Sequence, residues 1–179
     1  MRVFLDACVL YPTVLREVLT GCGARGLLVP LWSGKVLAEW RATARREGHE
    51  DWAVAEIAAL GDAFPEACVP EADTPGPLPA LPDPGDAHVL RAALAGHAEV
   101  IVTANLRDFP ARVLAPLGLS ARDPDRFLRA LWDEAPDPVA EVARAVHARA
   151  RAAGGPAEIR ALLQRAGLPR LGRALERAA

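Results

Sequence analysis

Apolar residues follow two different spacings along the first 120 residues. Short runs over residues 2–5 and 100–103 are apolar or β-branched apart from Arg2, which is typical of buried strands. A further short apolar run covers residues 27–31. Between these runs, apolar residues recur every three or four positions, as in helices that bury one face. The helical sets are Val14, Leu15, Val18 and Leu19; Val36, Leu37 and Trp40; Trp52, Ala55, Ile57 and Leu60; and Val89, Leu90, Ala93 and Leu94. This alternation predicts an α/β fold in which helices flank a parallel sheet.

Prolines, glycines and short polar residues predict the ends of these helices. Pro12 suits a first helical turn, and residues 21–23 and Gly96 suit helix ends because they contain glycine. Side-chain oxygens accept hydrogen bonds from the free N–H groups of a first turn. The N-cap candidates are Ser33, Asp51 and Asp86. Six prolines within residues 70–84 exclude regular structure there and predict a surface loop.

The residue pattern changes after Ser120. Four helical patterns follow, and each has a proline where a first turn is expected; these prolines are Pro124, Pro138, Pro156 and Pro169. The formal charge is −5 over residues 1–120 and +3 over residues 121–179. We therefore expect an all-α C-terminal extension over residues 138–179, after a first domain over residues 1–133. The basic extension fits a polyanion-binding segment and equally a solvated pair of helices.

Composition restricts the class of protein. A chain of 179 residues buries enough surface to fold without disulfides or a structural metal. Its cysteines, Cys8, Cys22 and Cys68, are odd in number and form no C-x-x-C pair, so we expect reduced thiols in a cytoplasmic protein. No apolar run approaches the roughly 20 residues of a membrane span, and Asp6 interrupts any signal-peptide core. We expect no membrane association.

Several acidic residues fall at related places in the predicted fold. Asp6 follows the first strand, Asp108 lies just past the second, and Asp86 begins the helix that leads into it. Because loops at the carboxyl ends of parallel strands converge, these residues are expected at one edge of the sheet. Glu39 lies at the border of a buried helical stripe, where a carboxylate must be paired, protonated or metal-bound. Each acid alone has a structural explanation, as a cap, a loop anchor or, for Glu39, a surface pair with Lys35. Together, however, they repel unless a cation lies between them.

Four blocks of sequence resemble the acidic blocks of PIN-domain ribonucleases, and toxins of the VapC type most closely. They are residues 5–10 (LDACVL), 37–40 (LAEW), 84–90 (PGDAHVL) and 102–109 (VTANLRDF). The resemblance covers residues 1–133, and the helical remainder is similar to an extension seen in one branch. It implies a catalytic and metal-binding quartet of Asp6, Glu39, Asp86 and Asp108. Thr103 and Asn105 are implied as supporting groups, and Asp83 is a second candidate beside Asp86.

The implied chemistry is hydrolysis of RNA phosphodiester bonds. An oxygen-only site suits Mg²⁺ or Mn²⁺. We hypothesise that Asp6 and Asp86 bind the ion directly, while Glu39 and Asp108 hold its waters or a second ion. The resemblance also implies an antitoxin partner, as in a type II toxin–antitoxin pair, and a homodimer. The arginines expected to contact RNA phosphates are Arg16, Arg107 and Arg112.

Three other activities require residues that this chain lacks. A haloacid-dehalogenase-like phosphatase needs an Asp where Cys8 stands, and a response-regulator receiver needs a lysine after a later strand, whereas the sole lysine is Lys35. Acyl transfer by Cys8 requires a histidine base beside it, and none of the four histidines is placed to indicate one. His88 is either a proton carrier or a structural residue on its helix. Two alternatives stay open: a non-catalytic α/β binding module and a structure-specific DNA nuclease on the same fold.

Overall fold

The computed structural model describes residues 1–70 and 78–178. These residues divide into two compact units. The first unit comprises residues 1–11 and 29–122, and the second comprises residues 12–28 together with residues from 123 onward. The predicted division into residues 1–133 and 138–179 stays a prediction. The two units are described separately below.

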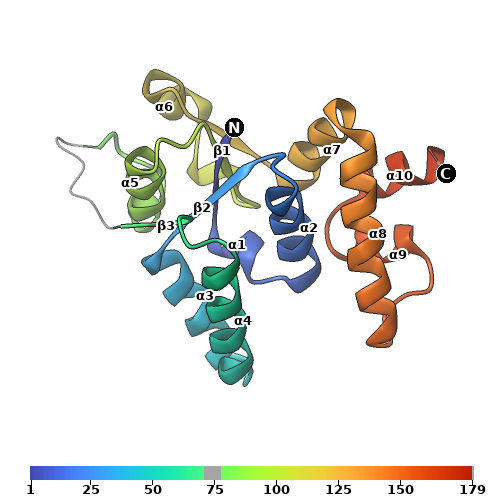
Figure 1. The fold of residues 1–179 in the computed structure, drawn as a ribbon. Helices are drawn as coiled ribbons and strands as arrows, with labels where there is room; N and C mark the ends of the chain where they lie inside the picture. The colour runs from blue at the N-terminus through green and yellow to red at the C-terminus, as the bar shows by residue number, and fades with distance from the viewer. Residues whose placement is uncertain (71–77, 179) are drawn as a thin grey trace. The chain divides into compact units, whose positions relative to one another are not determined.

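The first unit is built on a parallel sheet of five strands in the order β3-β2-β1-β4-β5 (Figure 1). The strands are β1 (Arg2–Leu5), β2 (Val29–Ser33), β3 (Cys68–Val69), β4 (Val100–Val102) and β5 (Ser120–Arg122). In the central strand β1, Val3, Phe4 and Leu5 are fully buried, as expected for a strand covered on both faces. The α/β prediction is therefore confirmed.

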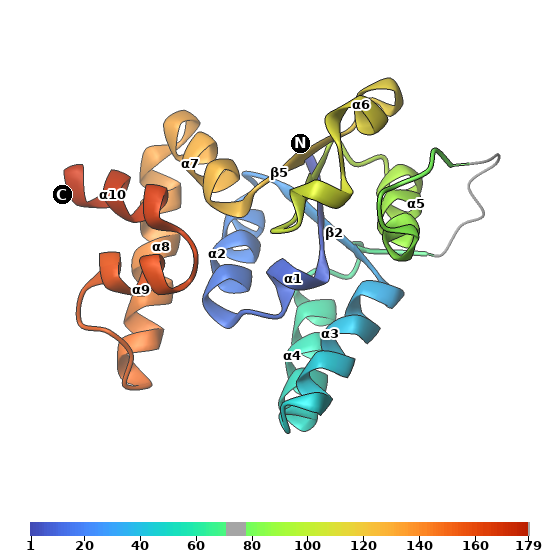
Figure 2. The ribbon, with the colours of Figure 1, turned by 180° about the vertical axis from the view of Figure 1, so that it is seen from behind.

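Helices surround this sheet and connect its strands. They are α1 (Ala7–Leu10), α3 (Gly34–Arg46), α4 (Glu50–Ala63), α5 (Ala87–Ala95) and α6 (Ala111–Leu114), with short 3-10 turns at Pro84–Asp86, Leu106–Asp108 and Ala115–Leu117. Ser33 caps α3 as predicted, because its Oγ accepts the Val36 N–H at 3.3 Å. Helices α3 and α4 run side by side (Figure 2), and Trp40 contacts Trp52 edge-on between them.

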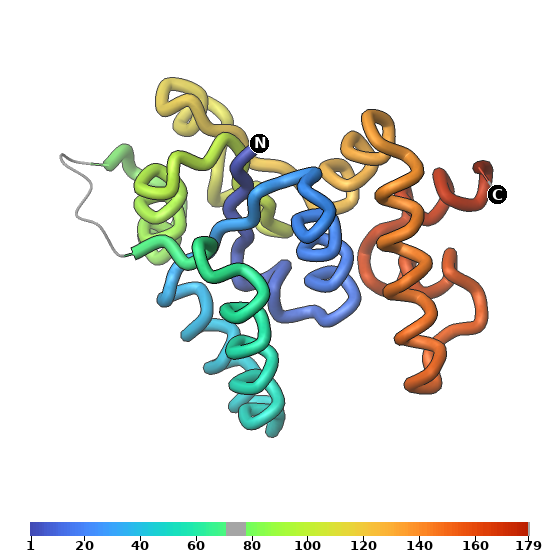
Figure 3. Tube along the Cα trace, in the orientation of Figure 1, coloured from blue at the N-terminus to red at the C-terminus, as the bar shows by residue number. Residues whose placement is uncertain are grey.

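The second unit is entirely helical. It contains α2 (Thr13–Ala24), α7 (Pro124–Glu134), α8 (Pro136–Ala152), α9 (Ile159–Arg165) and α10 (Pro169–Arg177). Helix α2 packs on α8, and α10 packs on both α7 and α9 (Figure 3). Gly21 of α2 allows the close approach, since a Cβ there would lie 2.6 Å from Cγ1 of Val142. The predicted helical segment after the sheet is confirmed.

Some predicted boundaries are wrong. Helix α4 begins at Glu50 after His49, so Asp51 lies in its first turn instead of capping it. Helix α8 begins at Pro136 instead of Pro138, because either proline fits a first turn. Helix α9 begins at Ile159 instead of Pro156, since the chain is still extended at Glu158.

The remaining differences concern short or glycine-containing segments. Helix α2 continues through residues 21–23 to Ala24, and α1, α6, β3 and β5 were not predicted. Within the predicted loop at residues 70–84, residues 71–77 lie outside the described part, and Pro84 begins a 3-10 turn. In residues 1–70 and 78–178, no helix has the length and apolar character needed to cross a bilayer.

Candidate metal and active site

The order in which strands are added to the sheet reverses at its central strand, β1. From β1 the chain proceeds to β2 and β3 on one side, and β4 and β5 lie on the other. Ligands of open parallel sheets bind at such a switch point, outside the carboxyl ends of the strands. Asp6 directly follows β1, and Thr103 directly follows the neighbouring β4. The predicted first acid and one predicted supporting residue therefore meet at this point.

Both carboxylate oxygens of Asp6 are held by hydrogen bonds. The Thr103 hydroxyl donates to Oδ2 at 2.7 Å, and the Ala7 N–H donates to Oδ1 at 2.7 Å, which caps α1. The Asn105 N–H donates to Thr103 Oγ1 at 3.0 Å, so the hydroxyl hydrogen is directed to Asp6. Asp6 is only 9% exposed. Its orientation is therefore fixed by the surrounding backbone.

Cys8 is a third group that contacts Asp6. Its Sγ donates to Oδ2 of Asp6 at 3.2 Å and accepts the Ala104 N–H at 3.3 Å. Burial of the thiol, and then the negative charge of Asp6, raise the pKa of Cys8 to about 11. The thiol is protonated at neutral pH, because a thiolate here would face a carboxylate. This environment is the opposite of one that activates a nucleophilic cysteine.

Three further carboxylates converge at the same sheet edge. Oxygens of Asp83, Asp86 and Asp108 lie within 4.8 Å of one another. Asp83 is held by the Gly85 N–H at 2.7 Å, and Asp108 accepts a hydrogen bond from Asn105 Nδ2. Carboxylate oxygens at this separation fit one hard divalent cation. Asp83, predicted only as a second candidate, thus belongs to the cluster.

The charge of this cluster appears in the pKa of Asp86. Burial, and then the negative charges of Asp6, Asp108, Asp83 and Glu39, raise this pKa to about 6. The other three members of the predicted quartet therefore each act on Asp86, although Asp6 and Glu39 are outside the group with oxygens within 4.8 Å. A bound cation would reverse this penalty and keep the carboxylates ionised.

Glu39 is paired with His88. His88 Nε2 lies 2.7 Å from Glu39 Oε1. Burial lowers the pKa of His88, so a neutral ring donates its Nε2–H to the carboxylate. Within the described part of the chain, the buried Nδ1 of this ring has no hydrogen-bond partner. Glu39, a carboxylate at the border of the core, is therefore paired as expected, and its partner is His88.

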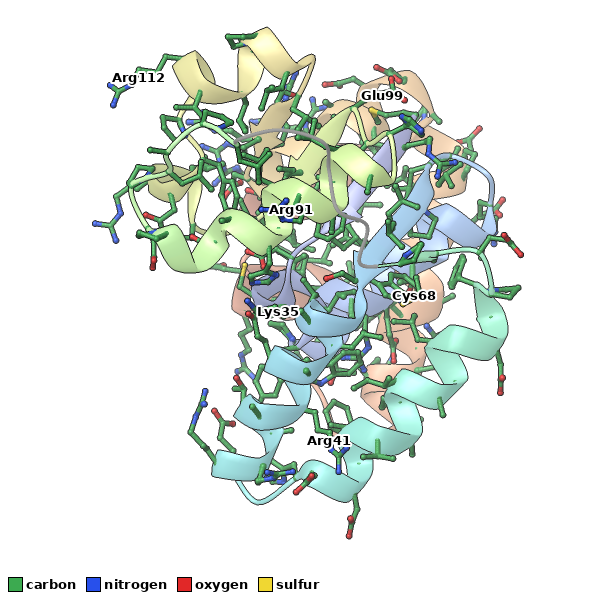
Figure 4. The ribbon with its side chains drawn as sticks, turned by 90° about the vertical axis from the view of Figure 1, so that its left-hand side faces the viewer. Lys35, Arg41, Cys68, Arg91, Glu99 and Arg112 are labelled. Carbon is green, nitrogen blue, oxygen red and sulfur yellow. The ribbon has the colours of Figure 1, made fainter. Side chains whose placement is uncertain are left out.

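The predicted RNA-contacting arginines differ in their exposure. Arg107 and Arg112 are exposed, and Arg112 extends outward from α6 (Figure 4). Arg16 is 3% exposed and lies in α2 of the second unit. The exposed members of the predicted set are therefore Arg107 and Arg112.

Two contacts of this site were not predicted from the sequence. One feature of the sequence could have indicated the contact of Cys8 with Asp6: the two residues are two positions apart across the start of a helix. The pairing of Glu39 with His88 joins α3 to α5, and nothing in the order of the residues indicates it.

Comparison with known proteins defines the class. Residues 2–107 match the family model described as PIN domain, which covers more than half of the chain. The chain therefore belongs to the PIN domain family, and the resemblance carried by the four acidic blocks is confirmed at that level.

One similar curated protein is "Putative ribonuclease VapC50" of Mycobacterium tuberculosis (strain ATCC 25618 / H37Rv), which is 54% identical over 43 residues. The match covers 24% of this chain and 25% of that protein. No solved structure matches the chain.

Proposed function

We propose that the protein is a Mg²⁺- or Mn²⁺-dependent endoribonuclease and the toxin of a type II toxin–antitoxin pair. One observation carries the proposal: carboxylate oxygens of Asp83, Asp86 and Asp108 lie within 4.8 Å of one another in a chain of the PIN domain family. The negative charges of Asp6 and Glu39 also act on the carboxyl of Asp86. Such a concentration of carboxylates is costly without a cation. RNA, as a polyanion, would approach these acids only if a metal ion offset their charge.

The donor set fits the proposed metal. It consists of carboxylate oxygens, and the neighbouring sulfur of Cys8 is a protonated thiol, which is a poor ligand. In this proposal Asp6 and Asp86 bind the ion directly, and Glu39 and Asp108 hold its waters or a second ion. The group of Asp83, Asp86 and Asp108, whose oxygens lie within 4.8 Å of one another, is where that second ion would bind. When bound, the ion supplies charge neutralisation at the scissile phosphate and activation of a water.

The other residues of the site have positioning roles. Thr103 and Asn105 fix the Asp6 carboxylate through their successive hydrogen bonds. His88 restrains Glu39 by donating from Nε2. Asp83 adds a carboxylate to the cluster at its exposed side. Arg107 and Arg112, exposed in the same unit, attract RNA phosphates in a salt-sensitive way.

A substrate and metal assay tests the proposal. An unstructured RNA, a structured RNA and a branched DNA are each incubated with Mg²⁺, with Mn²⁺ and with EDTA. We expect RNA cleavage only with metal, and we expect Asp6→Asn to abolish it while circular dichroism stays unchanged. Glu66→Gln, at an exposed acid of the same unit, is the matched control and keeps activity. Normal turnover by Asp6→Asn, or cleavage in EDTA, would refute the assignment.

The same experiment separates the two alternatives. Preferential cleavage of branched DNA favours a DNA nuclease. A ligand that binds only the folded protein must raise its thermal stability. The absence of any Mn²⁺-dependent rise in melting temperature at millimolar metal therefore favours a non-catalytic binding module.

The proposed antitoxin follows from the same electrostatics. An acidic edge with partly exposed carboxylates is complementary to a protein segment that presents a basic side chain. A cognate antitoxin should therefore inhibit RNA cleavage, and Asp86→Asn should weaken its binding. A homodimer is the second expected assembly and is tested by sedimentation equilibrium.

A further inference from the structure

The second unit contains a pocket lined by four arginines. Helices α7 and α10 enclose about 380 Å³. The lining residues include Arg129, Trp132, Arg170, Arg173, Ala174 and Arg177. We propose that this pocket binds the phosphate backbone of single-stranded RNA, as a binding site separate in composition from the acidic cluster. The choice of RNA rests on the proposed ribonuclease function.

The charge of this pocket is only partly balanced. Arg129 forms an ion pair with Asp133 within α7, and Arg170 lies 3.3 Å from Asp125. Within residues 1–70 and 78–178, Arg173 and Arg177 form no ion pair with a carboxylate, and both are exposed. Two guanidinium groups without a counter-charge therefore line the same pocket as two that have one. Like charges at this proximity repel, and an anion in the pocket removes that repulsion.

The arginine face of α10 has a fixed position. Residues 170, 173 and 177 are three and four positions apart, which places them on one side of the helix. Leu171 and Leu175 are buried on the other side. Asp125, 1% exposed, fixes the start of α10 by accepting the N–H groups of Arg170 at 2.9 Å and Leu171 at 3.1 Å. The helix that carries these arginines is therefore held against α7 before any ligand binds.

The lining favours a nucleic acid. Guanidinium groups match phosphate oxygens with paired hydrogen bonds, which lysines cannot reproduce. Trp132 lines the same pocket but is only 9% exposed, so it adds a small apolar contact to the wall. The pocket volume is within the range of small-molecule sites, about 300–1,000 Å³, and so admits more than a lone inorganic ion. An acidic peptide could use the same charges, so the choice of RNA over a peptide rests on the proposed function and is decided by the competition experiment below.

Equilibrium binding in the absence of metal tests the proposal. Fluorescence anisotropy of a short labelled single-stranded RNA is measured in EDTA over a series of salt concentrations, with the full chain. The test variant is R173Q/R177Q. The control is R151Q/R165Q, which removes the same charge from exposed positions of α8 and α9 that do not line the pocket. Circular dichroism verifies that both variants are folded.

We expect the pocket variant to bind RNA about tenfold more weakly than wild type near physiological salt. The slope of log affinity against log salt should fall by about 1.4, which is about 0.7 for each single-strand phosphate that an arginine no longer neutralises. The control variant should change affinity by less than about twofold.

Equal weakening by both variants, or weakening by neither, would overturn the proposal. If polyglutamate displaces the RNA as effectively as unlabelled RNA does, the pocket binds acidic proteins. If inorganic phosphate is equally effective, the pocket binds a single anion. Both outcomes refute an RNA site. Binding is measured without metal, so an inactive protein that still binds RNA here contradicts the nuclease proposal alone. Metal-dependent cleavage with no effect of R173Q/R177Q on binding contradicts the pocket alone.

Discussion

Replacing Asp86 with asparagine tests whether the acidic cluster destabilises the metal-free protein. Burial and four neighbouring negative charges raise the pKa of Asp86 from 3.8 to about 6. The native protein therefore holds this proton more tightly than the unfolded chain, and ionisation of Asp86 lowers the free energy of unfolding. This destabilisation is absent below pH 3.8, grows as the pH rises towards about 6, and is complete above that value. Asp86→Asn removes the charge and should remove the destabilisation.

The size of the effect follows from the shift. At about 1.4 kcal/mol for each pKa unit, the shift sets an upper bound of about 3 kcal/mol. The Asp86 side chain is partly exposed, so screening by water and salt reduces the expected gain to about 1 kcal/mol. For a chain of this size, that gain raises the melting temperature by about 2–4 °C. The start of α5 is not weakened, because the Asp86 side chain forms no capping hydrogen bond there.

Thermal melts followed by circular dichroism provide the measurement. Wild type, Asp86→Asn and the control Glu66→Gln are compared in EDTA at about pH 4 and at about pH 7.5. We expect the gain of Asp86→Asn only at the higher pH, and we expect saturating Mn²⁺ to stabilise wild type more than the variant. A variant that melts no higher than wild type at the higher pH, or gains equally at the lower pH, would show that the carboxylates do not repel as described.

Three further predictions concern other parts of the chain. Asp125→Ala should lower the free energy of unfolding by about 2–4 kcal/mol in urea denaturation, because it leaves the first N–H groups of α10 without an acceptor; an unchanged midpoint would contradict this. Cys8 and Cys68 are both exposed, but the pKa of Cys8 is about 11, so at about pH 8 alkylation followed by mass spectrometry should modify Cys68 well before Cys8; faster reaction of Cys8 would show that its thiol is not held by Asp6. Gly21→Ala should destabilise the protein by about 1–2 kcal/mol through its clash with Val142, and Val142→Ala in the same chain should restore most of the stability; a stable single variant would refute the close approach.

The sequence predicted those strands and helix starts that depend on the residues of one element alone. The strands β1 and β4 were predicted because their apolar runs are covered on both faces. By contrast, β3 has only two residues, and β5, with the sequence Ser-Ala-Arg, shows no apolar run; each is defined by backbone hydrogen bonds to its neighbouring strand. Prolines identified the starts of α7 and α10, but Pro136 and Pro138 both suit a first helical turn, so the sequence alone did not distinguish which of them begins α8.

In the candidate site, positions set by the local sequence were predicted, and contacts between distant segments were not. The positions of Asp6 and Asp86 at the ends of elements were predicted, because local sequence defines those ends. Which carboxylates approach one another was not, since Asp83 joins Asp86 and Asp108 only through the turn that begins at Pro84. The pairing of Glu39 with His88 likewise depends on how two separate helices pack.

The hydrogen bond from Thr103 to Asp6 joins positions that are 97 residues apart. Closing a loop of that length costs chain entropy before any favourable interaction offsets it, so pairing of β1 with β4 belongs to the slow, non-local part of folding. During translation, a nascent chain can form α3 and α4 well before β4 has left the ribosome. The acidic centre therefore assembles late, and a polypeptide released before that strand is made would carry Asp6 without the hydroxyl that orients it.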